Sequence, residues 1–226
     1  MRTKAVLALA LASAAVPAMA QVSFYVGASG GQAQTRAELV ANRESTILFA
    51  RDLRTDFDDK DTAWKAFGGV RLNSVVAVEA SYVDLGKHSM RTTLLGGDPP
   101  LPAAVTINRT VSGYGVDLVG TAPLGFQRFS LFGKVGAFRS RLEADASLEG
   151  NIEFSGGSGE RSRSTTRRET SFHYGIGADI GLARNLAVRI ELERFEDLGK
   201  AFVVGGEGTT GEADTDVLSV GVVFRF

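Results

Sequence analysis

The stretch Asp216-Val217-Leu218-Ser219-Val220-Gly221-Val222-Val223-Phe224-Arg225-Phe226, at the end of the chain, decides the fold. From Leu218 onward every second residue is apolar, and small or polar residues hold most positions between. Because side chains on a β-strand point alternately to its two faces, this stretch predicts a strand with one apolar face. That face consists of Leu218, Val220, Val222, Phe224 and Phe226, and the opposite face of Ser219, Gly221, Val223 and Arg225.

Segments with the same two-residue alternation recur along the whole chain. We count eight, each of about ten residues, which is the length that a tilted strand needs to cross a bilayer. In the clearer segments, one of the two sets of alternate residues keeps charge away from lipid and can form the outer face. An Arg or Lys side chain on that face costs about 2–4 kcal/mol at the bilayer midplane. The first two segments are rich in glycine and less decisive. The expected strands cover residues 24–33, 62–72, 75–85, 110–122, 129–141, 171–182, 186–197 and 216–226.

The connections between these segments alternate in length, with long ones outside and short ones inside, as is typical of bacterial transmembrane barrels. The fold class expected is therefore all-β: an eight-stranded antiparallel up-and-down transmembrane β-barrel with four long outward loops and short periplasmic turns. The long connections are residues 34–61, 86–109, 142–170 and 198–215, and the short ones 73–74, 123–128 and 184–185.

The faces opposite the apolar ones carry five cations and five anions. An eight-stranded barrel is just wide enough inside for side chains to fill it, and an unpaired buried charge costs several kcal/mol. We therefore expect an ion-paired network that fills the interior. A narrow polar conduit, opened when the pairs exchange partners, is the alternative. The ten residues are Lys65, Arg71, Lys134, Arg189, Arg225, Glu79, Asp117, Asp179, Glu191 and Glu193.

The first twenty residues have the pattern of a secretory signal peptide. Arg2 and Lys4 form a basic start, an apolar run covers residues 5–16, and a small-residue motif ends at Ala20. We expect cleavage after Ala20, which leaves residues 21–226 as one barrel domain. The chain contains no cysteine, and its formal net charge of −1 gives no general attraction to nucleic acid.

Together, these features carry a family resemblance. Phe24-Tyr25-Val26-Gly27-Ala28 follows the expected cleavage site, four long loops alternate with short turns, and the last strand closes on Phe226. The mature chain resembles the OmpA/OmpX-type eight-stranded outer-membrane proteins, with the barrel alone and no peptidoglycan-binding domain. The resemblance implies export to the outer membrane of a Gram-negative cell with the help of periplasmic chaperones. It also implies that the terminal strand is the signal read by the outer-membrane assembly machinery. It indicates fold more than activity.

No constellation of residues in the chain supports catalysis. Nucleophilic catalysis needs a serine or cysteine held by a base, and His88 and His173 are the only histidines, on separate segments. We expect no cofactor, no metal site and no enzyme activity. The predicted role is structural or concerned with surface interaction, as an adhesin or in envelope integrity. Two alternatives are a transporter for small solutes and an envelope-remodelling enzyme that uses His88.

Four arginines in the third long connection suggest a site for anions. Guanidinium groups match the oxyanions of lipopolysaccharide phosphates or of anionic host glycans. The partners expected are therefore outer-membrane lipids, lipopolysaccharide and a host or surface ligand. A polar loop without a ligand, or one paired with the acidic first loop, is the alternative. The four residues are Arg161, Arg163, Arg167 and Arg168.

Overall fold

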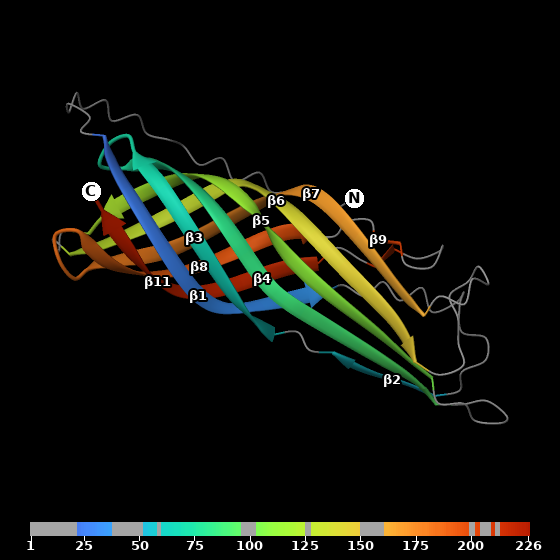
Figure 1. Ribbon diagram of the computed structural model, residues 1–226. Helices are drawn as coiled ribbons and strands as arrows, with labels where there is room; N and C mark the ends of the chain where they lie inside the picture. The colour runs from blue at the N-terminus through green and yellow to red at the C-terminus, as the bar shows by residue number, and fades with distance from the viewer. Residues whose placement is uncertain are drawn as a thin grey trace, which may run out of the picture.

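The chain forms a closed antiparallel β-barrel (Figure 1). Its structure is a computed structural model, in which β4 pairs with both β3 and β5 and so closes the wall. Among the residues described, no helix is long and apolar enough to cross a membrane. The structure describes residues 22–37, 52–57, 60–95, 103–124, 128–149, 161–198, 202–203, 209–210 and 213–226.

Eight strand positions make up the wall, as the alternation predicts. The short strand β2 (Asp52–Phe57) pairs with β4 beyond the end of β3, so it continues the same position. The two-residue strands β9 (Phe202–Val203) and β10 (Thr209–Thr210) form a separate hairpin. The wall strands are β1 (Ser23–Ala37), β3 (Lys60–Arg71), β4 (Val76–Leu95), β5 (Ala103–Pro123), β6 (Phe129–Glu149), β7 (Ser162–Gly181), β8 (Leu186–Leu198) and β11 (Ala213–Arg225).

The tight turns lie at the end of the barrel where the last strand finishes. The turn after β3 is closed by a 2.9 Å hydrogen bond from the Leu72 N–H to the Val76 carbonyl, and the turn after β7 by a similar bond of 2.8 Å from Leu182 to Leu186. The Phe226 N–H donates to the Phe24 carbonyl at 2.9 Å. Because short turns face the periplasm in barrels of this kind, this end is the periplasmic one.

Four wall strands are much longer than the sequence analysis predicts. The strands β4, β5, β6 and β7 have 20 or 21 residues each, so most of the predicted loops 86–109 and 142–170 is strand. Part of the predicted first loop is β2, and parts of the fourth are β9, β10 and the start of β11. The predicted bounds of these loops are therefore wrong, for a physical reason. Beyond the bilayer both faces of a strand meet water, so apolar residues no longer recur at every second position although the strands remain hydrogen-bonded.

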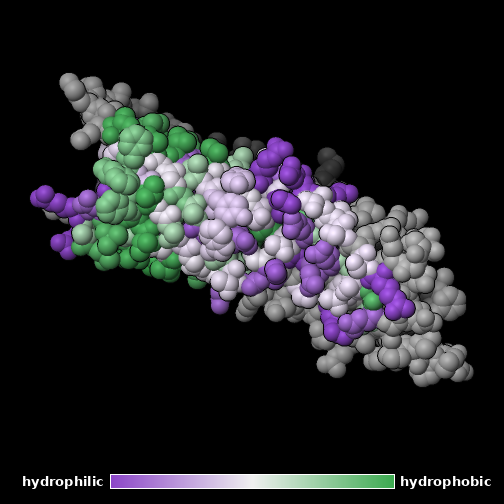
Figure 2. Space-filling model, in the orientation of Figure 1, coloured by the Kyte–Doolittle hydropathy of each residue, from purple (hydrophilic) through white to green (hydrophobic). Residues whose placement is uncertain are grey.

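The outer face of the barrel is apolar toward the periplasmic end. Figure 2 shows hydrophobic side chains gathered there and hydrophilic ones toward the other end. The alternation predicted for β11 is confirmed, because Leu218, Val220 and Val222 are each more than half exposed while Val223 is buried. A wide band of exposed apolar side chains on a closed sheet suits contact with lipid.

A close approach between β1 and β11 requires glycine at position 31. A Cβ added to Gly31 would overlap the backbone carbonyl of Leu218, whereas one added to Gly30 would meet nothing nearer than the Ala63 carbonyl at 4.0 Å. We expect Gly31→Ala to destabilise the barrel by about 1–3 kcal/mol through overpacking, and Gly30→Ala to have little effect. Urea unfolding in detergent, followed by the fluorescence of the single tryptophan Trp64, measures both. Equal stability of the two variants would contradict this account.

Candidate functional site

The interior of the barrel holds a line of charged side chains, and Arg189 is the centre of its periplasmic half. Arg189 and Asp179 are direct cross-strand partners on β8 and β7, and the guanidinium donates to both carboxylate oxygens, at 2.8 and 3.2 Å. A further N–H reaches Glu79 on β4 at 2.9 Å, and the Tyr25 hydroxyl donates to the same oxygen at 2.9 Å. Arg225 donates to Asp179 at 2.9 Å. The charge of each group is therefore balanced by a neighbour.

Aromatic rings surround the Arg189 guanidinium. Its central carbon lies 4.3 Å from the ring centroid of Phe132, 4.9 Å from that of Phe67 and 5.7 Å from that of Tyr25. A guanidinium near the face of an aromatic ring is stabilised by the ring's quadrupole, and more so when water is excluded. The rings belong to an apolar cluster with Ala77, Val119, Ala187 and Val223, which fills the periplasmic part of the interior.

Two lysines and two glutamates form the middle of the line. Lys65 on β3 is ion-paired with Glu191 and, at 2.6 Å, with Glu193, both on β8. Lys134 on β6 is ion-paired with the same two glutamates, at 2.7 Å to Glu191. Its ammonium also lies 3.9 Å from a carboxylate oxygen of Glu79. Because β3 and β6 lie on different sides of β8 in the barrel, these side chains meet across the lumen and join separate parts of the wall.

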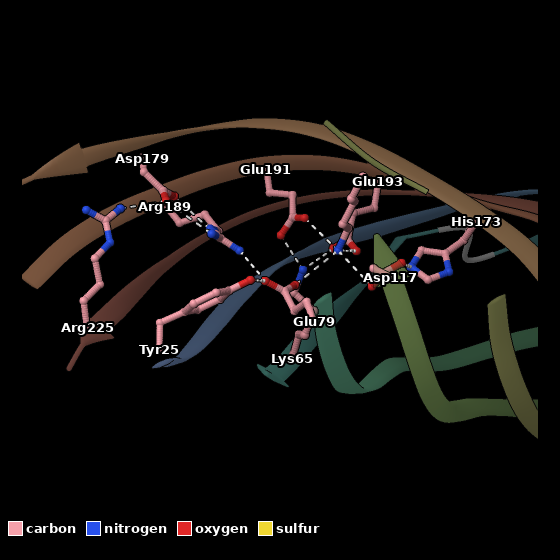
Figure 3. Close-up of polar contacts among 11 residues, drawn as sticks. Tyr25, Lys65, Glu79, Asp117, His173, Asp179, Arg189, Glu191, Glu193 and Arg225 are labelled. Carbon is pink, nitrogen blue, oxygen red and sulfur yellow. Dashed lines mark hydrogen bonds and ion pairs between the residues drawn. The ribbon is translucent and has the colours of Figure 1, made fainter. Parts of the chain in front are cut away.

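The outward end of the line is Asp117 with His173. The His173 Nε2 lies 2.8 Å from the Asp117 carboxylate, and the imidazole stacks on Phe195 with ring centroids 4.9 Å apart. Phe138 contacts both rings edge-on. Above them a second apolar cluster includes Leu85, Val111 and Leu198. Figure 3 shows the line of polar side chains from Arg225 to His173. The second cluster lies at the outward end of this line, whereas the first surrounds Arg189.

Nine of the ten interior charges singled out from the sequence join this network, and one lies apart. The Arg71 guanidinium lies over the Tyr25 ring, 5.9 Å from its centroid. Lys65, Glu79, Asp117, Lys134, Asp179, Arg189, Glu191 and Glu193 are at most 3% exposed, whereas the Arg225 side chain is 31% exposed at the periplasmic rim. The network members are Lys65, Glu79, Asp117, Lys134, Asp179, Arg189, Glu191, Glu193 and Arg225.

The four arginines assigned to an anion-binding loop are placed differently from that prediction. Arg163, Arg167 and Arg168 lie on β7, and Arg161 immediately precedes it. β7 is paired with β6 as far as Ser162, so these arginines lie along a hydrogen-bonded strand and not in a loop. Arg168 is exposed and lies directly opposite Arg141. His88 likewise lies within β4, opposite Arg109.

The sequence analysis overlooked the aromatic residues of the interior. Tyr25, Phe67, Phe132, Phe138 and Phe195 are all at most 5% exposed, inside a barrel predicted to be polar within. The signal was available on β1, because Tyr25 shares its parity with Ser29 and Ala33 and opposes Phe24 and Val26. An apolar side chain at a position that alternates with the outward residues is the pattern that would have revealed them.

This arrangement can hold the strands in one register and exclude water from the lumen. Buried ion pairs add stability only when each charge also has good hydrogen bonds, and losing one partner is costly. The ring contacts and the two apolar clusters occupy the remaining width, which suits the narrow interior of an eight-stranded barrel.

Comparison with known protein families settles the class. The model of the outer membrane protein beta-barrel domain matches residues 6–226. The chain belongs to the outer-membrane β-barrel family. Its place is therefore the outer membrane, and the apolar band of Figure 2 is its lipid-facing surface.

Several solved structures are similar to this outer-membrane β-barrel protein at low sequence identity. Neisserial surface protein A (NspA) has a TM-score of 0.47 at 13% identity, covering 91% of this chain and 99% of that one. The N-terminal barrel of Pseudomonas aeruginosa OprF has a TM-score of 0.44 at 12% identity, covering 90% and 97%. Ail of Yersinia pestis, an attachment invasion locus protein, has a TM-score of 0.42 at 15% identity, covering 91% and 97%. None of the curated proteins compared with the chain matches it significantly.

Proposed function

We propose that this protein is a closed membrane anchor that acts through the parts of its strands beyond the outer leaflet, in adhesion or in envelope integrity. The observation that carries the proposal is the filled interior. Lys65, Lys134, Glu191 and Glu193 tie different sides of the wall together at the middle of the lumen. Such a barrel serves as a rigid support, and its surface beyond the membrane is available to partners.

The long strands supply that surface. A tilted strand needs about 9–11 residues to cross the hydrocarbon, and β4 to β7 have 20 or 21 each. About half of each strand therefore extends beyond the bilayer, on the side opposite the tight turns. Arg161 and the serines and threonines that follow it on β7 are exposed there, which favours contact with an anionic surface.

Delivery to the membrane is part of the same proposal. Residues 1–20 would direct export and be removed after Ala20. The outward residues of β11, together with Phe226 directly after it, would then be read by the assembly machinery after escort by periplasmic chaperones. Sequencing the N-terminus of protein purified from outer membranes tests the first step, and a start at Gln21 is expected.

A truncated β6–β7 hairpin tests the surface role. Glu143 and Thr166 are direct partners, so residues 144–165 can be replaced by Asn-Gly without changing the register below. We expect attachment of expressing cells to immobilised heparan sulfate to fall by about threefold, since the replacement removes Arg161, and an exposed arginine contributes a few tenths to about 1 kcal/mol.

The matched control shortens the neighbouring hairpin. Lys87 and Thr110 are also direct partners, so residues 88–109 can be replaced in the same way. Attachment should persist in this variant, because its exposed Arg91 is already ion-paired with Glu149 at 2.8 Å. Both proteins should show the shift in gel mobility between unheated and boiled samples that a closed barrel gives. If the β6–β7 truncation attached as well as wild type, the proposal that this hairpin binds an anionic partner would be refuted.

A narrow solute channel is the second candidate, and the surroundings of Lys134 favour it. Besides its two close glutamates, its ammonium lies 3.9 Å from Glu79 and 3.9 Å from Asp117, so a small shift would exchange partners along the axis. Exchange of this kind could open a polar path. Wild-type protein in planar bilayers should then conduct ions, and silence would remove this candidate.

A further inference from the structure

We propose that Arg139, Arg141 and Arg168 form a binding site for the phosphorylated headgroup of a lipopolysaccharide molecule in the outer leaflet. The three arginines lie side by side on the outer face of β6 and β7. Arg141 is the direct partner of Arg168, and Arg139 is two residues below Arg141 on the same face of β6. The site is on the lipid-facing wall, so it is separate from any partner bound by the hairpin tips.

This arrangement of arginines does not stabilise the sheet. Like charges directly opposite one another on neighbouring strands are destabilising. Arg141 has a partner on its own strand, since its guanidinium lies 2.7 Å from the Glu143 carboxylate. Arg139 and Arg168 have no ion-pair partner among the residues that the structure describes. The cluster therefore keeps two uncompensated positive charges on the outside of the wall.

The position of the cluster matches the level of lipid headgroups. Arg139 is the direct partner of Tyr114, which packs against Tyr82 with ring centroids 5.2 Å apart, and Tyr82 packs against Trp64 at 5.3 Å. Outward aromatic side chains of this kind mark the membrane–water interface of barrels. On β7, the apolar outer face ends at Phe172, four residues below Arg168.

The cluster lies at the outer of the two interfaces. The tight turns and the C-terminus are at the opposite, periplasmic end. Figure 2 shows hydrophilic side chains over β6 and β7 directly beyond the apolar surface. The outer leaflet at this level presents the phosphates of lipid A, and planar guanidinium groups bind phosphate oxygens in a bidentate manner. A lipid with its acyl chains along the apolar wall would place its phosphate among these arginines.

Titration with lipid A tests the site. Full mature protein in zwitterionic detergent micelles is titrated with bisphosphorylated lipid A, and affinity is measured by thermophoresis. Arg139→Gln/Arg168→Gln should bind about 30-fold more weakly than wild type, because each arginine near an anionic lipid surface contributes about 1 kcal/mol. Lipid A without phosphates should bind wild type with a similar deficit.

A second double variant controls for lost charge. Arg128 and Arg184 are exposed arginines at the periplasmic end, so Arg128→Gln/Arg184→Gln removes the same charge from the wrong interface and should bind lipid A like wild type. Equal weakening in both double variants would overturn the proposal, as would equal binding of dephosphorylated lipid A. Displacement of lipid A by inorganic phosphate at comparable concentration would identify a site for free anions instead and would also overturn it.

Discussion

Lys134→Met is expected to destabilise the folded barrel by about 3–5 kcal/mol, the cost of removing one partner from a buried charge cluster. The Lys134 side chain is fully buried and ion-paired with Glu191 and Glu193. Without it, Lys65 alone would neutralise both glutamates while Glu79 and Asp117 lose a nearby cation. Methionine fills a similar volume, so the expected loss is electrostatic. Urea unfolding in detergent, followed by Trp64 fluorescence, measures it.

Two further variants separate charge from packing. Lys87→Met removes an exposed lysine on β4 and should change the stability by no more than about 0.5 kcal/mol. In Lys134→Met both glutamates depend on Lys65 alone, so adding Glu193→Gln removes the excess carboxylate and should restore at least about 1 kcal/mol, a coupling typical of residues within one network. If Lys134→Met were as stable as wild type, the lumen would have to admit water or ions, which favours the channel.

The sequence predicts the barrel well because lipid imposes one simple rule on every strand. Where the outer face meets hydrocarbon, as for Leu218 and Val220 on β11, apolar residues must recur at every second position. That rule holds across the bilayer and ends at its surface. The extensions of β4 to β7 lie beyond the bilayer surface. Their serines, threonines and arginines therefore show no alternation of apolar and polar residues by which a strand could be told from a loop.

The interior could be predicted only in part. The two-residue alternation alone predicted that Lys65 and Glu191 face the interior. Their strands are separated around the wall by β1 and β11, so no local sequence pattern reveals that the two side chains meet across the lumen. The aromatic rings around Arg189 were missed because polar residues were the ones expected inside. Arg139 shares its parity with the outward Val135, so its lipid-facing position could have been read from the predicted strand.

The resemblance also makes a prediction about Phe226 that the folded structure alone would not suggest. The Phe226 side chain is 71% exposed and contacts Phe224 edge-on, with ring centroids 5.1 Å apart. Its backbone N–H, which bonds to Phe24, survives substitution. Phe226→Ala should therefore refold in detergent with a stability within about 0.5 kcal/mol of wild type, as surface substitutions usually do. In cells, the amount in the outer membrane should drop to a small fraction of the wild-type amount.

A phenylalanine on another strand separates the assembly signal from lipid contact. Phe172 on β7 is 51% exposed on the same outer face, so Phe172→Ala loses a comparable apolar surface without altering the terminal strand. Outer-membrane fractions of cells that express each variant from the same plasmid measure the yield. Phe172→Ala should assemble like wild type. If both variants assembled equally well, or were depleted equally, the last residue would count only as lipid-facing surface, and recognition of β11 would have to depend on other positions.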